Sequence, residues 1–455
     1  MVDHSVLSIV KSILILEDND ERITAFQNAV AVLGEGFELK VWRDALSMIA
    51  ECEAFFPTAA LISLDHDLNP MPGATVDPGT GLDVARFLGD FMPACPVLIH
   101  SSNTEKVYSM HNELRFAGWT VERVGPIGAD WIETFWWRNA GRLLAEHSNT
   151  WKALLPTDHG SRAERMKLSL DGLGLGDALG EMLSYRAEDA SRRLTENNLP
   201  AGPWFHTDDT EMAISIVAVL ESHGFVNADA LAKRFARRFE RDPERGYGKM
   251  TRIQLREIND GAKWRDTAAN AFGGQGSKGN GSAMRVAPLG AYFAEDLERC
   301  AEEARISSGV THTHPEGVAG AIAVAIAAAV AWQLRNEAAE DRPRRFFDEV
   351  LQFMPETHVG RGVLLASTMT TDISATAAAQ VLGNGSLVTA PDTVAFCLWM
   401  AAHHLGNFVE ALGRTISVGG DCDTNAAIVG GIVALSAGQE SIPAEWLKSR
   451  ETIRI

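Results

Sequence analysis

Two short motifs in the second half of the chain combine hydroxyl and paired carboxylate side chains. Thr207-Asp208-Asp209-Thr210 directly precedes an apolar helical pattern, and Asp421-Cys422-Asp423-Thr424 follows the glycine pair Gly419-Gly420 and opens another helix. Such groups often do no more than cap a helix N-terminus and suit its dipole. If the fold brings both motifs together, they form a cage of hard oxygen ligands that suits Mg²⁺ or Mn²⁺, with room for two ions.

A glycine-rich loop and a histidine segment lie between these motifs. The loop reads GSKGNGSAMR over residues 276–285, and the segment reads THTHP over residues 311–315. Backbone N–H groups of such a loop can hold a phosphate. Tight turns also require glycine, and a lone loop histidine such as His312 is more often a capping or packing residue.

The first half of the chain has polar side chains directly after its apolar runs. Glu17 and Asp18 follow the first run, Asp65 and His66 follow the third, and His100 follows the fourth. Ligands of an open parallel sheet bind beyond the carboxyl ends of its strands, where these residues would meet. Carboxylates and imidazoles there are suited to metal binding and proton transfer. The alternative is that the histidines only satisfy backbone groups at the strand ends.

The elements that must position these residues differ between the two halves. Up to about Gly128, β-rich runs alternate with helical patterns, which predicts an open parallel α/β sheet of five strands at 13–16, 37–42, 59–64, 96–101 and 119–124. From about Met166 helical periods dominate and predict an all-α domain with helices at 210–222, 228–239, 318–334, 344–352, 372–382, 391–411 and 424–437. We therefore predict domains at 1–148 and 166–455, joined by a linker at 149–165.

Composition limits the class of protein. A formal net charge of −19 argues against non-specific binding to nucleic acid or anionic membranes, although a small basic pocket is compatible with it. The longest apolar run, from Val318 to Trp332, is shorter than the roughly 20 residues of a membrane-spanning helix and predicts a buried, Ala-rich core helix. Five cysteines without a CxxC pair favour a reducing, cytoplasmic setting.

Together with GDALGE at residues 176–181, the motifs of the second half resemble those of the ADP-ribosylglycohydrolase family in order and character. The resemblance extends from about Met166 to the C-terminus and implies an all-α fold. It also implies hydrolysis of the bond between C1″ of the distal ribose of ADP-ribose and a leaving group, with two Mg²⁺ or Mn²⁺ ions. The implied metal ligands are Thr207, Asp208, Asp209, Asp421, Asp423 and Thr424. The implied substrate contacts are Gly279, Asn280, Gly281, Ser282, Met284 and His312.

The resemblance also bears on the catalytic groups. Asp209 is the first candidate for contact with both metal and water, because carboxylates there would activate water and stabilise an oxocarbenium-like transition state. Many relatives have an acid four residues beyond the second glycine of the GDxxG motif, where this chain has Ser184. Glu181 directly follows that glycine, so either Glu181 takes over the gating or base role, or the chain works without it.

Over residues 11–137 the first half resembles a response-regulator receiver. Glu17 and Asp18 match the acidic pair, and Asp65 matches the phospho-accepting position, but Gly125 stands where a receiver has Lys before Pro126. The segments LDHDL (64–68) and IHSSN (99–103) are similar to the cyclic-phosphate-processing receiver-like branch. That resemblance implies action on ADP-ribose 1″,2″-cyclic phosphate by Asp65, His66 and His100. A second metal site would use Glu17, Asp18 and Asp65.

These observations lead to one main hypothesis and two alternatives. The chain is expected to be a hydrolase of ADP-ribose derivatives, with a small molecule containing ADP-ribose or an ADP-ribosylated macromolecule as its partner. In the first alternative, the receiver-like half only regulates a protein ADP-ribosyl hydrolase. In the second, the protein binds ADP-ribose without catalysis, against which the presence of all six metal-site residues argues.

Overall fold

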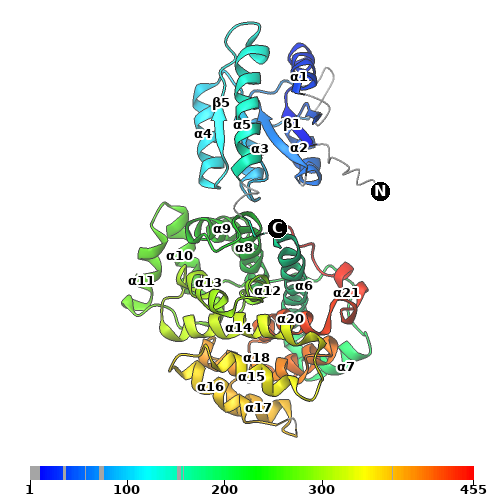
Figure 1. The fold of residues 1–455 in the computed structure, drawn as a ribbon, viewed down its shortest axis with the longest axis vertical. Coiled ribbons are helices and arrows are strands. Elements are labelled where there is room, and N and C mark those ends of the chain that lie inside the picture. The colour runs from blue at the N-terminus through cyan, green and yellow to red at the C-terminus, as the bar shows by residue number, and fades with distance from the viewer. Residues whose placement is uncertain are drawn as a thin grey trace, which may run out of the picture. The chain divides into compact units, whose positions relative to one another are not determined.

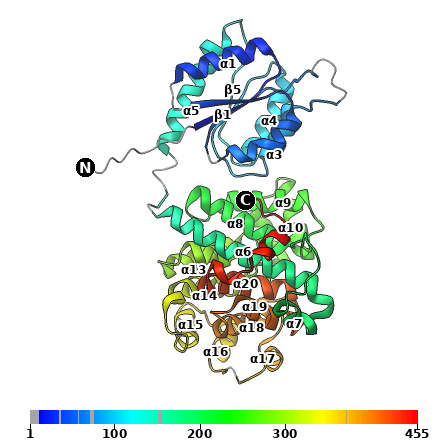
Figure 2. The same ribbon diagram turned by 90° about the vertical axis from the view of Figure 1, so that its right-hand side faces the viewer.

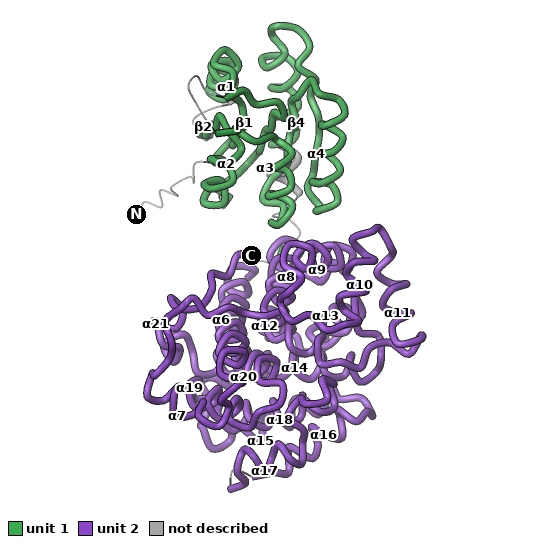
Figure 3. Tube along the Cα trace, turned by 180° about the vertical axis from the view of Figure 1, so that it is seen from behind, with its two compact units in different colours: residues 1–155 green, residues 156–455 purple. Residues whose placement is uncertain are grey.

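The computed structural model describes residues 11–455 except 34–36, 57, 71–75, 151–154, 157 and 371. The chain forms two compact units, residues 1–155 and 156–455 (Figure 3). The division between them falls within the segment predicted as a linker. The long first helix of the second unit already begins at His159.

The first unit is built on a five-stranded parallel sheet with the strand order β2-β1-β3-β4-β5 (Figure 1). The strands are β1 (Lys11–Leu16), β2 (Phe37–Trp42), β3 (Ala59–Leu64), β4 (Val97–Ile99) and β5 (Val121–Arg123). The helices are α1 (Asp20–Leu33), α2 (Ala45–Glu51), α3 (Gly81–Leu88), α4 (Thr104–Phe116) and α5 (Trp137–Thr150). The predicted parallel α/β sheet is confirmed, and β4 and β5 are shorter than predicted.

Both faces of this sheet are covered, which explains why its inner strands β1, β3 and β4 are almost entirely apolar and buried. Ile13 and Ile15 of β1 pack with residues of α1 and α5 on one face. Leu14 and Leu16 pack with residues of α2, α3 and α4 on the other face. Figure 2 shows α1 and α5 on one side of the sheet and α3 and α4 on the other. The polar residues that follow the strands therefore lie at one edge of a rigid sheet.

Among its described residues, the second unit is helical apart from isolated β-bridges. Its helices are α6 (His159–Leu183), α7 (Ala190–Thr195), α8 (Asp208–His223), α9 (Ala228–Arg241), α10 (Lys249–Asn259), α11 (Trp264–Gly274), α12 (Ala287–Tyr292), α13 (Leu297–Gly309), α14 (Pro315–Gln333), α15 (Arg342–Leu351), α16 (His358–Ser367), α17 (Ala375–Leu382), α18 (Ala390–His403), α19 (Phe408–Ile416), α20 (Cys422–Ala437) and α21 (Ala444–Ser449). The predicted all-α fold is confirmed. The single helix predicted at 391–411 is wrong, because the chain turns between α18 and α19.

The central helix α14 has the length and apolar composition of a membrane-spanning helix when its following turn is included. However, 78% of its most apolar stretch is buried inside the protein. It packs against α12, α13, α18 and α20, which agrees with the prediction of a buried, Ala-rich core helix.

Helices α6 and α20 make the most extensive helix contact of the second unit. Gly172, Gly176 and Gly180 are spaced four residues apart and so lie on one face of α6. A Cβ added at Gly180 would lie 2.6 Å from Asp423 Cα, and one added at Gly176 would lie 2.5 Å from the Ala426 carbonyl carbon. The glycines therefore allow α6 to approach the α20 backbone closely, at the end where α20 carries its acidic motif.

Candidate active sites

The two acidic motifs of the second unit meet at the N-terminal ends of α8 and α20. Asp177, which projects from α6, lies beside them and is fully buried. Its carboxylate accepts hydrogen bonds from the backbone N–H and hydroxyl of Thr207, at 3.0 and 2.9 Å. It accepts two more from the N–H and hydroxyl of Thr210, at 3.0 and 2.5 Å. Asp177 thus holds the first turn of α8 in place against α6.

Carboxylate oxygens of Asp177, Asp209 and Asp423 lie within 4.8 Å of one another. Asp209 Oδ1 is buried and has no hydrogen-bond partner among the residues that the structure describes. A buried carboxylate oxygen without a partner is costly unless a cation or a proton satisfies it. This group of oxygens has the ligand chemistry of a magnesium or manganese site.

The pKa shifts within this acidic cluster also indicate a cation site. Burial and the neighbouring acids Asp177 and Asp423 raise the pKa of Asp208 and Asp209 well above the usual range. Burial and Asp423 raise the pKa of Asp421 to about 7, and burial raises that of Asp177 to about 6. Carboxylates held this close cannot all ionise at neutral pH without a compensating positive charge. The residues present therefore fit divalent cations.

A cavity of about 510 Å³ opens onto this cluster, a size typical of small-molecule sites. Its lining brings together most of the predicted site residues: Asp208, Asp209, Gly279, Asn280, Gly281, Met284, His312, Asp421, Asp423 and Thr424. Three predicted residues do not line it. Thr207 is held behind the cluster by Asp177, and the Ser282 hydroxyl donates to the Gly317 carbonyl at 2.9 Å. Glu181 is solvent-exposed on the last turn of α6, where partial desolvation of its carboxyl and the charge of nearby Asp423 raise its pKa.

The glycine-rich loop has a packing role beside its predicted phosphate role. A Cβ at Gly279 or Gly281 would come within 3.2 Å of the His312 ring, so a larger residue at either position would require the ring to shift by a few tenths of an ångström. The Gly279 N–H already donates to Ser277 Oγ at 3.2 Å. Asn280 Nδ2 donates to Asp421 Oδ2 at 2.7 Å, and so orients one of the candidate metal ligands. Burial and the Arg285 guanidinium lower the pKa of His312 to about 3, which makes it a neutral wall residue.

Some lining residues had no functional signal in the sequence. Lys249 and Thr251 open α10, Phe272 lies at a kink near the end of α11 with φ of 52°, and Val388 stands on a loop with φ of 53°. A left-handed conformation of non-glycine residues is costly and clusters at binding sites. Asp177 was part of the GDALGE motif, but only the tertiary structure shows it at the acidic cluster.

In the first unit, Glu17, Asp65 and His100 offer ligand atoms within 4.8 Å of one another, and all three side chains are buried. His100 Nε2 lies 3.4 Å from Glu17 Oε2, and both atoms lack a hydrogen-bond partner. Arg22 of α1 reaches the same group, with Nη1 at 3.2 Å from Asp65 Oδ2 and 3.5 Å from Glu17 Oε2. Sequence reasoning missed Arg22, which lies one turn beyond the acidic pair.

Asp18 and His66, also predicted for this site, are directed elsewhere. Asp18 Oδ2 accepts from the Asn69 backbone and side chain at 2.7 and 2.9 Å. His66 Nδ1 lies 2.8 Å from Asp67 Oδ1. The predicted grouping of Glu17 with Asp65 is therefore present in the structure, with His100 in place of Asp18.

The surroundings shift the pKa values of the two buried acids of this cluster in opposite directions. Burial raises the pKa of Asp65, and the charge of Glu17 adds to that effect. For Glu17 the effect of burial is outweighed by His100, the Asn19 N–H and Arg22, which lower its pKa. Paired groups whose pKa values are driven apart are typical of an acid and a base that work together.

Comparisons with known proteins match each unit separately. Residues 158–454 match the family model described as ADP-ribosylglycohydrolase, and residues 14–116 match the model described as cyclic-phosphate processing receiver domain. ADP-ribosylhydrolase ARH3 of Xenopus tropicalis is 30% identical over 326 residues, which cover 63% of this chain and 91% of that protein. The human protein of the same name is 29% identical over 281 residues, covering 54% of this chain and 75% of its own length.

A solved structure entitled "ADP-ribosylglycohydrolase-related protein complex" aligns with 64% of this chain and 93% of its own, at 24% identity and a TM-score of 0.46. The family model alone covers well over half of the sequence. The chain therefore belongs to the ADP-ribosylglycohydrolase family and carries a cyclic-phosphate processing receiver domain at its N-terminal end.

Proposed function

We propose that the second unit is a divalent-metal-dependent ADP-ribosylhydrolase that cleaves the bond between ribose C1″ and a leaving group. The observation that carries the proposal is the buried cluster of carboxylates at the floor of the 510 Å³ cavity. Asp208, Asp209, Asp421, Asp423 and Thr424 would hold Mg²⁺ or Mn²⁺. When bound, such cations would supply Lewis acidity to the oxygen atoms of the sugar and of water.

The other walls of the cavity suit the rest of an ADP-ribose group. Lys249 and Thr251 stand at the first turn of α10, where a positive side chain, a hydroxyl and free backbone N–H groups favour a diphosphate. Phe272 and Val388 provide apolar surface for a nucleoside. His312, kept neutral, adds no charge that would repel a sugar cation in the transition state.

The chemical step needs a base and a route for one proton. Asp209 Oδ1, the buried oxygen without a partner, is the atom we assign to accept a proton from the attacking water. The C1″–O bond to water forms as the bond to the leaving group breaks, and the proton passes to the leaving group. Asn280 acts indirectly, because it orients Asp421.

The test is a product assay with the full chain and Mg²⁺. Peptides ADP-ribosylated on arginine and on serine are supplied separately, and released ADP-ribose is measured by liquid chromatography. We expect Asp209→Asn to abolish release, whereas Asp189→Asn, on the exposed surface of the same unit, retains it. Release that persists in Asp209→Asn would refute this assignment of the base.

For the first unit we propose hydrolysis of ADP-ribose 1″,2″-cyclic phosphate at the Glu17–Asp65–His100 cluster. Arg22 would neutralise phosphate oxygens, because it already lies between the two carboxylates. Water adds to phosphorus and one ring P–O bond breaks, which leaves a phosphomonoester and a free hydroxyl, and the proton that water loses restores the protonated Asp65 carboxyl. Asp65, whose pKa is raised, is suited to donate the proton to that leaving oxygen.

The cyclic phosphate is tested in the same assay. We expect Asp65→Asn to spare the substrate, whereas Asp20→Asn at an exposed position of α1 consumes it. Acetyl phosphate provides the arm for the alternative, in which this unit is a regulator: stable labelling of Asp65, combined with an unconsumed cyclic phosphate, would favour regulation and overturn the catalytic proposal.

A further inference from the structure

A second cavity of the helical unit borders the same Thr207–Asp209 segment. It has a volume of about 810 Å³, and His206 and Glu211 line it, whereas Asp208 and Asp209 line the cavity described above. The two cavities have no lining residue in common. No step of the proposed hydrolysis uses this second cavity, which we call the basic cavity.

The name reflects its charge, which is unusual for a chain with a net charge of −19. Its acidic lining residues are Glu211 and Glu451, and its cationic ones are Arg238, Arg241, Arg245, Lys448, Arg450 and Arg454. Asp171 and Asp242 stand outside the lining and pair with Arg450 and Arg245. The cations still outnumber all four acids by two, so the cavity attracts anions.

The positive charge is available to a ligand at the C-terminal side. Lys448 and Arg454 are exposed, and their side chains form no hydrogen bond or ion pair within the described part of the chain. Arg450 Nη2 binds Asp171, and its Nε and Nη1 are buried without a partner among the described residues, so Arg450 adds positive charge to the cavity but no accessible N–H donor at these two atoms. An exposed guanidinium such as that of Arg454 is well suited to phosphate oxygens.

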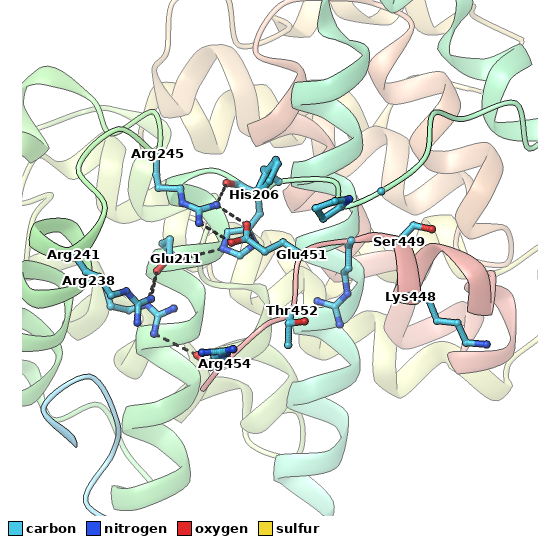
Figure 4. Close-up of a pocket in the computed structure, with 14 residues that line it drawn as sticks. His206, Glu211, Arg238, Arg241, Arg245, Lys448, Ser449, Glu451, Thr452 and Arg454 are labelled. Atoms are coloured by element: carbon cyan, nitrogen blue, oxygen red, sulfur yellow. Dashed lines mark hydrogen bonds and ion pairs between the residues drawn. The ribbon is translucent and has the colours of Figure 1, made fainter. Parts of the chain in front are cut away.

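The C-terminal segment of the cavity wall is rigidly held. Arg245 forms a two-pronged ion pair with Glu451, at 2.6 and 2.7 Å, and also donates to the His206 carbonyl at 2.8 Å (Figure 4). The Trp204 N–H donates to the Ser449 carbonyl, and the Glu451 N–H donates to the Trp204 carbonyl, both at 2.8 Å. These bonds fix residues 449–451 as a wall, so a ligand meets preformed positions.

Apolar surface adjoins these charges. Phe205 lines the basic cavity together with Pro203, and 62% of the Phe205 side chain remains exposed. An exposed ring next to a cluster of cations is the combination that binds a nucleotide, since the base stacks on the ring while the cations hold the phosphates. A bare inorganic anion would use only half of this surface.

We propose that the basic cavity is an accessory binding site for a nucleoside diphosphate, separate from the catalytic cavity. Lys448 and Arg454 hold the phosphates, the charge of Arg450 adds to the attraction, and Phe205 carries the base. Occupancy of this site does not require the metal ligands or the hydrolytic step, so the proposal stands independently of the bond that the second unit cleaves.

The experiment measures binding of ADP to the full-length chain by isothermal titration calorimetry in EDTA, with inorganic pyrophosphate and adenosine as separate ligands. We expect ADP to bind more tightly than pyrophosphate, and both affinities to fall with increasing salt. The double variant Lys448→Ala/Arg454→Ala should weaken ADP binding at least about tenfold, because hydrogen bonds between charged groups are lost. Phe205→Ala should reduce ADP affinity to that of pyrophosphate.

The matched control is Lys167→Ala/Arg305→Ala, which removes the same two charges from exposed positions that line neither cavity. It should bind ADP like the unmodified chain. ADP binding with unchanged affinity and stoichiometry in Lys448→Ala/Arg454→Ala would overturn the proposal, since all of the bound ADP would then occupy the catalytic cavity. Equal affinities for ADP and pyrophosphate would overturn the assignment of a nucleotide. Retained ADP-ribose release by the double variant would support the separation of the two sites.

Discussion

The close approach of α6 to α20 makes a prediction about metal binding that needs no change to any ligand. In Gly180→Ala the new Cβ would lie 2.6 Å from Asp423 Cα, whereas ordinary contacts begin near 3.4 Å, so the two helices must separate by about 0.8 Å. The obstructing atom belongs to the backbone and cannot rotate away. The separation moves Asp423 away from Asp177 and opens the acidic cluster.

The magnitude follows from two opposed effects. Overpacking of a tight interface costs up to about 3 kcal/mol, while alanine gains about 1 kcal/mol over glycine within a helix. The net loss of about 2 kcal/mol corresponds to a fall in Tm of about 4 °C for a domain of this size. Mn²⁺ affinity should fall by about 10- to 100-fold, as it does when groups that orient metal ligands are disturbed.

Gly160→Ala is the matched control, because Gly160 lies on the same helix and a Cβ there meets no atom within 4 Å. Thermal unfolding and Mn²⁺ titration followed by electron paramagnetic resonance are compared for both variants. Gly160→Ala should keep full Mn²⁺ affinity and an unchanged or slightly higher Tm. Identical Tm and Mn²⁺ affinity for the two variants would refute the idea that the glycine face sets the geometry of the site.

Three further predictions concern the same region. Asp177→Asn replaces one carboxylate oxygen, which accepts hydrogen bonds from Thr207 and Thr210, by an amide group that donates. The free energy of unfolding, measured with denaturant, should fall by about 3 kcal/mol. A smaller loss than that caused by Thr210→Val would contradict this prediction. Asp421, with its pKa raised to about 7, binds protons more readily in the folded than in the unfolded chain, so its contribution to stability is lost as pH rises from about 4 to 7. Bound Mg²⁺ should offset that loss, so the Tm measured with Mg²⁺ should exceed the Tm measured with EDTA by a margin that grows from pH 5 to 8. The margin should grow less in Asp421→Asn. A margin that does not depend on pH would be inconsistent with this prediction. His206 and Arg238 outweigh the effect of burial on Glu211 and lower its pKa to about 2. The ionised carboxylate therefore stabilises the fold above pH 4.5, and this stabilisation is lost as the pH falls toward 2. Glu211→Gln should reduce the fall in Tm over this acid range, and an unchanged fall in Tm would count against the prediction.

The fold class of both halves could be predicted because it depends on local patterns. The apolar run at 59–64 matches β3, since a strand covered on both faces needs no alternation, whereas FELKVW at 37–42 alternates apolar and charged residues and forms the edge strand β2. The helix predicted at 391–411 was wrong because its apolar periodicity continues across the turn between α18 and α19. Apolar periodicity indicates which face of a helix is buried, but it does not show where one helix ends and the next begins in a new direction.

By itself, the sequence determined the chemical character of the sites: carboxylates at helix starts, glycines in one loop, and acids with histidines after strands. Only the tertiary structure decided which of them meet. Asp177 joins the acidic cluster because the glycine face of α6 lies on α20, and Asp18 leaves the receiver site because Asn69 binds its carboxylate. Local propensity acts over a few residues, whereas the direction of a side chain and its distant neighbours depend on how whole elements pack.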